Sequence, residues 1–367
     1  MLATKFYPGA FLIVWIFSTM IWSESLKRPQ NPRPPFPYLS ENVEFLSQGL
    51  LLKGTVTRPK TPGLHKSIVL ITGSGPQNRD EEILGHKPFL VLSDYLSRNG
   101  YVVLRYDERG VGESQGEFSQ ATSKDFMQDA LSAWKFLRSQ SYSDPKQTGL
   151  LGHSEGGMVA IMAAAIEPEI AFLVLLAASV HPLSEIMHDQ RQRAYDMAGI
   201  TKEHSNKLQN SHQRLVQLAC HQGSDLAILK ESLNLARISL PISKPLNKEE
   251  RNQRKLSLRQ LAKYVEATYK SPWMRFVLQY DPIHDLKKVS CPVLALNGEL
   301  DTQVPAKSSL DLIQTALANA GNHQVTIHSL PNLNHLFQKA VSGEVSEYAI
   351  IEETINPSVL KIIAEWL

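Results

Sequence analysis

Short apolar runs alternate with longer amphipathic segments along most of the chain. The runs are apolar at consecutive positions, which is typical of parallel strands buried on both faces of a sheet. We expect strands at residues 68–72, 102–106, 150–152, 172–177, 293–297 and 325–329. Helical spacing predicts helices at 89–99, 124–138, 155–166, 306–318 and 357–367. The alternation predicts an α/β fold with a doubly wound, mostly parallel sheet.

Two internal segments depart from this alternation. Residues 43–58 are expected to form two short strands, for which a hairpin is one arrangement. No convincing strand occurs in the long stretch before residue 293, so we interpret residues 183–288 as a mostly helical insertion. Its charged run at 244–260 carries both signs, which favours a solvated helix face over a basic binding patch. The predicted core domain is therefore 41–182 together with 289–367.

The N-terminus has the pattern of a targeting segment. Lys5 precedes an apolar run at residues 10–22, and the small residues Ser23 and Ser25 follow it. The run is shorter than the roughly 20 residues that cross a membrane, so we expect a signal peptide at 1–25 and export to the periplasm or the medium. The alternative is an uncleaved membrane anchor at 10–22. Residues 26–40, which include RPQNPRPPFP, are expected to form an extended linker.

Composition and charge exclude several classes of protein. The formal net charge of +2 gives no field that would attract a nucleic acid. The two cysteines are too few for a disulfide scaffold or a cysteine-based zinc site. Gly73-Ser74-Gly75 lacks the third glycine of a dinucleotide fingerprint, and no His, Cys, Asp or Glu cluster has metal-ligand spacing. We therefore expect no metal and no cofactor, and a small molecule as the partner.

Candidate chemistry begins at LLGHSEGGMVA, residues 150–160. The pentapeptide from Gly152 to Gly156 fits G-x-S-x-G, and it lies between an apolar strand and an alanine-rich helix. This strand–turn–helix setting is that of a nucleophile elbow, which predicts Ser154 as a nucleophile.

A nucleophilic serine needs a histidine base and a carboxylate that orients it. Asp301 and His335 follow two later strands, so the three residue types occur at three strand ends in the order Ser, Asp, His. Glu299 is the alternative carboxylate. His153 is expected to pack or hydrogen-bond locally, whereas His181, His284, His323 and His328 lack the loop position after the last strand.

An oxyanion hole should accompany this triad. One donor is expected to be the amide of Glu155, directly after the nucleophile, and the other the amide of Ser74, with Gly75 as second choice. The alternative is that residues 72–76 form an ordinary glycine-rich turn. Asp107 and Arg109 could reach the loops of the site, a structural ion pair or loop hydrogen bonds are the alternative, and neither is given a catalytic role. For Asp281 and Asp285 we expect helix capping.

Five stretches together resemble a known family: ITGSGPQNRDEE, LRYDERGVGES, LLGHSEGG, PVLALNGELDTQVPA and LPNLNHLF. The chain resembles the α/β-hydrolase superfamily, in particular bacterial carboxylesterases with a serine-aminopeptidase-like domain, over roughly residues 43–367. The resemblance implies an α/β-hydrolase fold with a helical cap and hydrolysis of carboxylic esters. The same triad also suits a peptidase or a thioesterase, and an inactive binding protein is a further alternative. The chain has Thr72 where many members have histidine.

Overall fold

The computed structural model describes residues 27–221, 223–241 and 245–367. The described chain divides into two compact units, a smaller one of residues 182–280 and a larger one of residues 27–181 and 281–367. The predicted signal peptide or anchor at 1–25 lies outside the described residues. None of the helices in the described part of the chain is long and apolar enough to cross a membrane.

The larger unit contains an eight-stranded sheet in the order β1-β2-β4-β3-β5-β6-β7-β8. The strands are β1 (Tyr38–Ser47), β2 (Leu50–Pro59), β3 (His65–Ile71), β4 (Val102–Tyr106), β5 (Ser143–His153), β6 (Leu173–Leu176), β7 (Val293–Gly298) and β8 (Val325–Leu330). β1 and β2 form an antiparallel hairpin, β2 also pairs antiparallel with β4, and the remaining neighbours are parallel. The predicted hairpin and the mostly parallel, doubly wound sheet are therefore confirmed.

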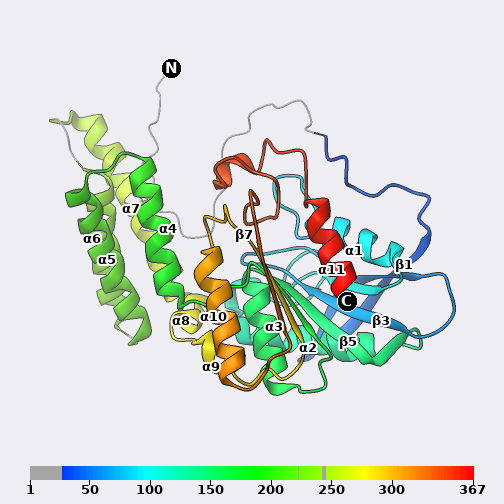
Figure 1. The fold of residues 1–367 in the computed structure, drawn as a ribbon. Coiled ribbons are helices and arrows are strands. Elements are labelled where there is room, and N and C mark those ends of the chain that lie inside the picture. The colour runs from blue at the N-terminus through cyan, green and yellow to red at the C-terminus, as the bar shows by residue number, and fades with distance from the viewer. Residues whose placement is uncertain (1–26, 222, 242–244) are drawn as a thin grey trace. The chain divides into compact units, whose positions relative to one another are not determined.

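Helices cover both faces of this sheet (Figure 1). They are α1 (Pro88–Arg98), α2 (Ser123–Arg138), α3 (Glu155–Ile166), α9 (Pro282–Leu286), α10 (Ala306–Asn319) and α11 (Pro357–Trp366), with short 3₁₀ turns η1 (Phe118–Gln120) and η2 (Val345–Glu347). α1 and α11 lie on one face, and α2, α3 and α10 on the other (Figure 1). Since every connection between parallel strands crosses over through a helix, the C-terminal ends of β3, β5, β7 and β8 lie at one edge of the sheet.

The core of the larger unit explains why the sequence of its central strands consists of apolar runs. Leu151, Val174 and Leu294 come from three adjacent strands, and all three are fully buried. They belong to one cluster with Phe89 of α1 and Val359 of α11. Burial of strand residues on both faces of a sheet requires consecutive apolar positions, which is the pattern seen in the sequence.

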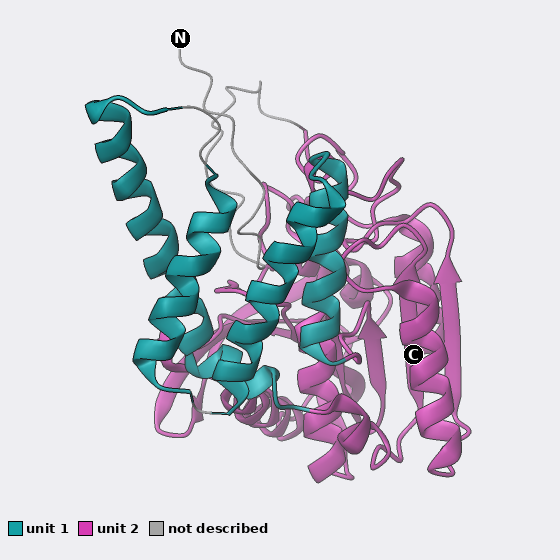
Figure 2. Cartoon of the chain, turned by 90° about the vertical axis from the view of Figure 1, so that its left-hand side faces the viewer, with its two compact units in different colours: residues 1–18, 182–280 teal, residues 19–181, 281–367 magenta. Residues whose placement is uncertain are grey.

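The regular secondary structure among the described residues of the smaller unit is helical (Figure 2). Its helices are α4 (Leu183–Met197), α5 (Lys202–Cys220), α6 (Asp225–Ser239), α7 (Lys248–Lys270) and α8 (Pro272–Val277). It has an apolar core of its own, which includes Tyr195, Leu215 and Tyr269.

Two predicted boundaries were wrong. Residues 281–288, assigned to the insertion, belong to the larger unit, because Asp281 caps α9 and this helix lies against α3 and α10. The proline-rich residues after 26 do not form a free linker. Arg28 donates hydrogen bonds to the carbonyls of Leu84 and Ile351, and Gln30 accepts from the Thr354 amide, so structure begins before residue 40.

Candidate active site

Ser154 occupies the turn between β5 and α3. β5 ends at His153 and α3 begins at Glu155, and Ser154 has φ 55° and ψ −117°. A positive φ is unfavourable for a residue with a side chain, and it persists only where the surroundings impose it. The flanking glycines permit the turn, since a Cβ on Gly152 would lie 2.1 Å from the Gly156 carbonyl oxygen, and one on Gly156 would lie 2.1 Å from that of Ile71.

Backbone hydrogen bonds hold this turn in place. The Ser154 amide donates to the Leu176 carbonyl at 2.8 Å, which fixes the turn to the end of β6. The Ser154 carbonyl accepts from the amides of Gly157 and Ser179, both at 3.1 Å. The serine is therefore presented on a rigid support rather than on a mobile loop.

Asp301 and His335 are in direct contact. Asp301 Oδ2 accepts a hydrogen bond from His335 Nδ1 at 2.7 Å, and both side chains are buried. Asp301 Oδ1 accepts from the amides of Gln303 and Val304 at 2.8 and 2.9 Å. These two amides fix the carboxylate, and a proton on Nδ1 leaves the Nε2 of a neutral His335 as a proton acceptor.

His153 connects the serine turn to the histidine loop. Its ring lies 4.8 Å from the His335 ring, centroid to centroid, and its Nε2 donates to the His335 carbonyl oxygen at 3.0 Å. Its Nδ1 contacts Glu81 Oε1 at 2.9 Å. His153 was expected to pack or hydrogen-bond locally. It packs against the His335 ring, but its hydrogen-bond partners lie 72 and 182 residues away in sequence.

The loop after β3 borders Ser154. A Cβ built on Gly73 would lie 3.3 Å from the Ser154 Cβ. The Gly73 amide donates to Glu81 Oε1 at 2.7 Å, so this amide is occupied. Ser74 comes next in the chain and is half-buried. Glu155 is the first residue of α3, where helix amides point out of the N-terminal end. The two predicted donor positions thus flank the serine turn.

A buried glutamate, Glu108, holds both ends of this loop. The Thr72 hydroxyl donates to Glu108 Oε1 at 2.6 Å, and the Gln77 amide donates to Oε2 at 3.0 Å. Burial raises the pKa of Glu108 well above its usual value, the two hydrogen bonds oppose this rise, and the charges of Glu155 and Glu81 add to it. Glu108 and Glu155 also line a small cavity beside the loop. Sequence reasoning assigned no role to Glu81 or Glu108, although both lie in stretches that carry the family resemblance, because their partners are distant in sequence.

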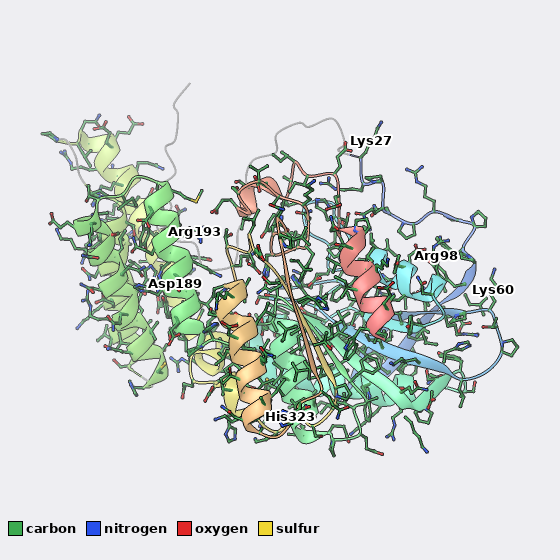
Figure 3. The ribbon with its side chains drawn as sticks, viewed as in Figure 1. Lys27, Lys60, Arg98, Asp189, Arg193 and His323 are labelled. Atoms are coloured by element: carbon green, nitrogen blue, oxygen red, sulfur yellow. The ribbon has the colours of Figure 1, made fainter. Side chains whose placement is uncertain are left out.

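The other candidate residues have structural roles. Arg109 pairs with Asp129, and Asp107 pairs with Arg79 in the loop after β3. Both residues therefore form ion pairs, and Asp107 also reaches the loop that borders Ser154. Glu299 accepts from Ser329 at 3.1 Å. His323 lies in the turn between α10 and β8, before rather than after the last strand (Figure 3).

Asp281 caps α9 as predicted, whereas Asp285 lies inside that helix and pairs with Lys288, so its predicted capping role was wrong. Among residues 27–221, 223–241 and 245–367, no group of three His, Cys, Asp or Glu side chains is arranged to hold a metal ion.

Comparisons with known proteins agree with this architecture. Esterase EstD of Thermotoga maritima is 27% identical over 325 residues, which cover 86% of this chain and 65% of that protein. Thiohydrolase apmlB of Arthrinium phaeospermum is 29% identical over 165 residues, which cover 44% of this chain and 50% of that protein. The matches thus span less than two thirds of these relatives' own lengths.

A solved structure shares the fold. Hypothetical protein PA2218 from Pseudomonas aeruginosa matches with a TM-score of 0.53 at 15% identity, over 92% of this chain and 96% of that chain. Residues 88–339 match the model of the family described as serine aminopeptidase, S33. With its mostly parallel eight-stranded sheet, its helices on both faces and its strand–serine–helix turn, the chain belongs to this family of α/β hydrolases.

Proposed function

We propose that this hydrolase cleaves carboxylic esters through an acyl-enzyme formed on Ser154, with His335 as the base and Asp301 as the orienting carboxylate. The observation that carries the proposal is the 2.7 Å hydrogen bond between Asp301 and His335. These residues lie in the loops that follow β7 and β8, at the same edge of the sheet as the Ser154 turn. An esterase among the relatives supports the choice of substrate class.

The mechanism follows the roles of a serine triad. His335 Nε2 takes the Ser154 hydroxyl proton as Oγ attacks the acyl carbon, and the same proton then passes to the departing alcohol oxygen. Water, which loses a proton to His335, attacks the acyl carbon of the acyl-enzyme. The bond to Ser154 Oγ then breaks, His335 returns the proton to this oxygen, and the acid is released. Asp301 stabilises the charged imidazole in both halves of the reaction.

The oxyanion formed in each step is assigned to the amides of Ser74 and Glu155. Such a donor lowers the barrier only if it is already in place, and losing one costs about 100- to 1,000-fold in kcat in comparable enzymes. The occupied Gly73 amide supports Ser74 as the donor from the loop after β3.

The test is the Ser154→Ala variant assayed on p-nitrophenyl esters of short and medium acyl chains. The variant should lose hydrolysis and labelling by a fluorophosphonate while its melting temperature and circular dichroism stay those of the unmodified chain. Unchanged turnover would overturn the assignment. Unmodified protein that neither reacts with the probe nor turns over an ester would favour an inactive binding protein.

A thioester hydrolase is the second candidate, because a thiohydrolase is among the relatives. The same acyl-enzyme forms from either substrate, and only the leaving group differs. Comparing kcat/KM for a p-nitrophenyl ester, an acyl thioester of the same chain length and an aminoacyl p-nitroanilide separates esterase, thioesterase and aminopeptidase. We propose further that residues 1–25 direct export of the enzyme.

A further inference from the structure

Glu81 is a buried carboxylate that the mechanism above does not use. It lies in the loop after β3, its side chain is 5% exposed, and its backbone has φ 52°. One oxygen, Oε1, accepts both from the Gly73 amide at 2.7 Å and from His153 Nδ1 at 2.9 Å. Glu81 thereby ties the loop that borders Ser154 to the last residue of β5.

His153 has an acceptor at each ring nitrogen. Nδ1 faces the Glu81 carboxylate and Nε2 faces the His335 carbonyl oxygen at 3.0 Å. A neutral ring has only one N–H, whereas the doubly protonated ring donates to both acceptors. Burial opposes protonation, but the Glu81 charge and hydrogen bond, with the His335 carbonyl and the Asp301 charge, raise the pKa of His153 above its usual value.

We propose that Glu81 and His153 form a buried ion pair that positions the oxyanion loop and the base loop relative to Ser154. The inference rests on the function proposed above and names two positioning residues for that reaction. Neither side chain is assigned to touch the substrate.

The contacts show how the pair acts on each part of the site. Glu81 occupies the Gly73 amide, which leaves the following amide, that of Ser74, for the oxyanion. His153 anchors the backbone of His335, while Asp301 anchors its ring. The proposed reacting groups come from the ends of β3, β5, β7 and β8, and the pair joins three of these ends, those of β3, β5 and β8. A displacement of about 1 Å in such a site can cost roughly 100-fold in rate.

The test compares Glu81→Gln and His153→Gln with Glu82→Gln, the same substitution at the exposed neighbouring position. Rates are measured on a p-nitrophenyl ester across pH and divided by the number of serines that a fluorophosphonate labels. We expect kcat per labelled site to fall roughly 10- to 100-fold in the first two variants, with KM changed less than about twofold. Glu82→Gln should match the unmodified enzyme.

A third variant tests the charge of Glu81 itself. Glu81→Asp keeps the charge and shortens the side chain, so we expect its kcat per labelled site to lie between that of Glu81→Gln and that of the unmodified enzyme. The proposal is overturned if kcat per labelled site in Glu81→Gln equals that in Glu82→Gln. A fall in kcat that is as large in Glu81→Asp as in Glu81→Gln would also overturn it, because the negative charge of the ion pair would then contribute nothing. If the unmodified enzyme is inactive on esters, or Ser154→Ala is active, the proposed function fails instead.

Discussion

Asp301 accepts a hydrogen bond from His335 Nδ1 on one carboxylate oxygen, at 2.7 Å, and from the amides of Gln303 and Val304 on the other. The second oxygen locks the carboxylate, so the first can hold only one orientation and one tautomer of the imidazole. Because the two oxygens have different hydrogen-bond partners, we expect even an isosteric replacement of Asp301 to reduce activity.

Asp301→Asn should reduce kcat on a p-nitrophenyl ester by about 10⁴-fold, because an amide that donates to Nδ1 leaves the proton on Nε2. The melting temperature should change little, since the amide retains the shape of the carboxylate. Asp311→Asn on the exposed face of α10 is the matched control and should keep full activity. A loss of less than tenfold in Asp301→Asn would contradict the orienting role.

Glu108→Gln should change how stability depends on pH. The pKa of Glu108 is raised in the folded protein, whereas in the unfolded chain it has its ordinary value of 4.5. Above pH 4.5 the folded protein therefore keeps a proton on Glu108 that the unfolded chain releases. The unmodified protein therefore loses stability as the pH rises above about 4.5, and the loss continues until the raised pKa is passed.

Glutamine carries no charge and can still bond to Thr72 and Gln77. We expect Glu108→Gln to be more stable than the unmodified chain at pH 8 and equal to it near pH 4, in urea unfolding experiments. Glu365→Gln, at an exposed position on α11, should show no such difference. Equal stability of Glu108→Gln and the unmodified chain at both pH values would show that Glu108 is charged in the fold.

Gly156→Ala should prevent correct formation of the serine turn. The added methyl group would meet the backbone oxygen of Ile71 at 2.1 Å, and neither backbone can move without disturbing β3 or α3. We expect a loss of roughly 3 kcal/mol or more of unfolding free energy, together with loss of fluorophosphonate labelling.

Gly49→Ala provides the comparison for this variant. A Cβ at this position would meet nothing within 4 Å, so only the positive φ of 83° disfavours alanine there. We expect Gly49→Ala to lower the unfolding free energy by about 1–2 kcal/mol and to leave fluorophosphonate labelling intact. Similar losses in the two variants would mean that close contact at the turn is not the decisive factor.

Expression of the full chain in a bacterial host tests the proposed export signal. Cleavage near residue 25 should yield a periplasmic protein whose intact mass lacks the first segment, and a chain lacking residues 1–25 should stay in the cytoplasm. An uncleaved anchor would instead give full-length protein in the membrane fraction. Full-length protein free in the cytoplasm would exclude both.

Several features of the site were predictable because they are local in sequence. The turn at Ser154 needs a strand, two small residues and a helix within eleven residues of one another, and the stretch 150–160 contains them all. Asp301 and His335 were identifiable because each follows an apolar strand in the loop beyond it. The boundaries of the insertion and the linker were less well predicted, because α9 and residues 28–30 are held by contacts with distant segments.

The sequence by itself determined which strand ends carry the serine, the carboxylate and the histidine, because apolar periodicity and turn chemistry act over a few residues. Only the tertiary structure decided that Glu81 meets His153 and that Glu108 meets Thr72, across 72 and 36 positions. Those contacts exist because β3 lies between β4 and β5 in the sheet. Periodicity reports which residues are buried, whereas the order of strands sets which buried residues become neighbours.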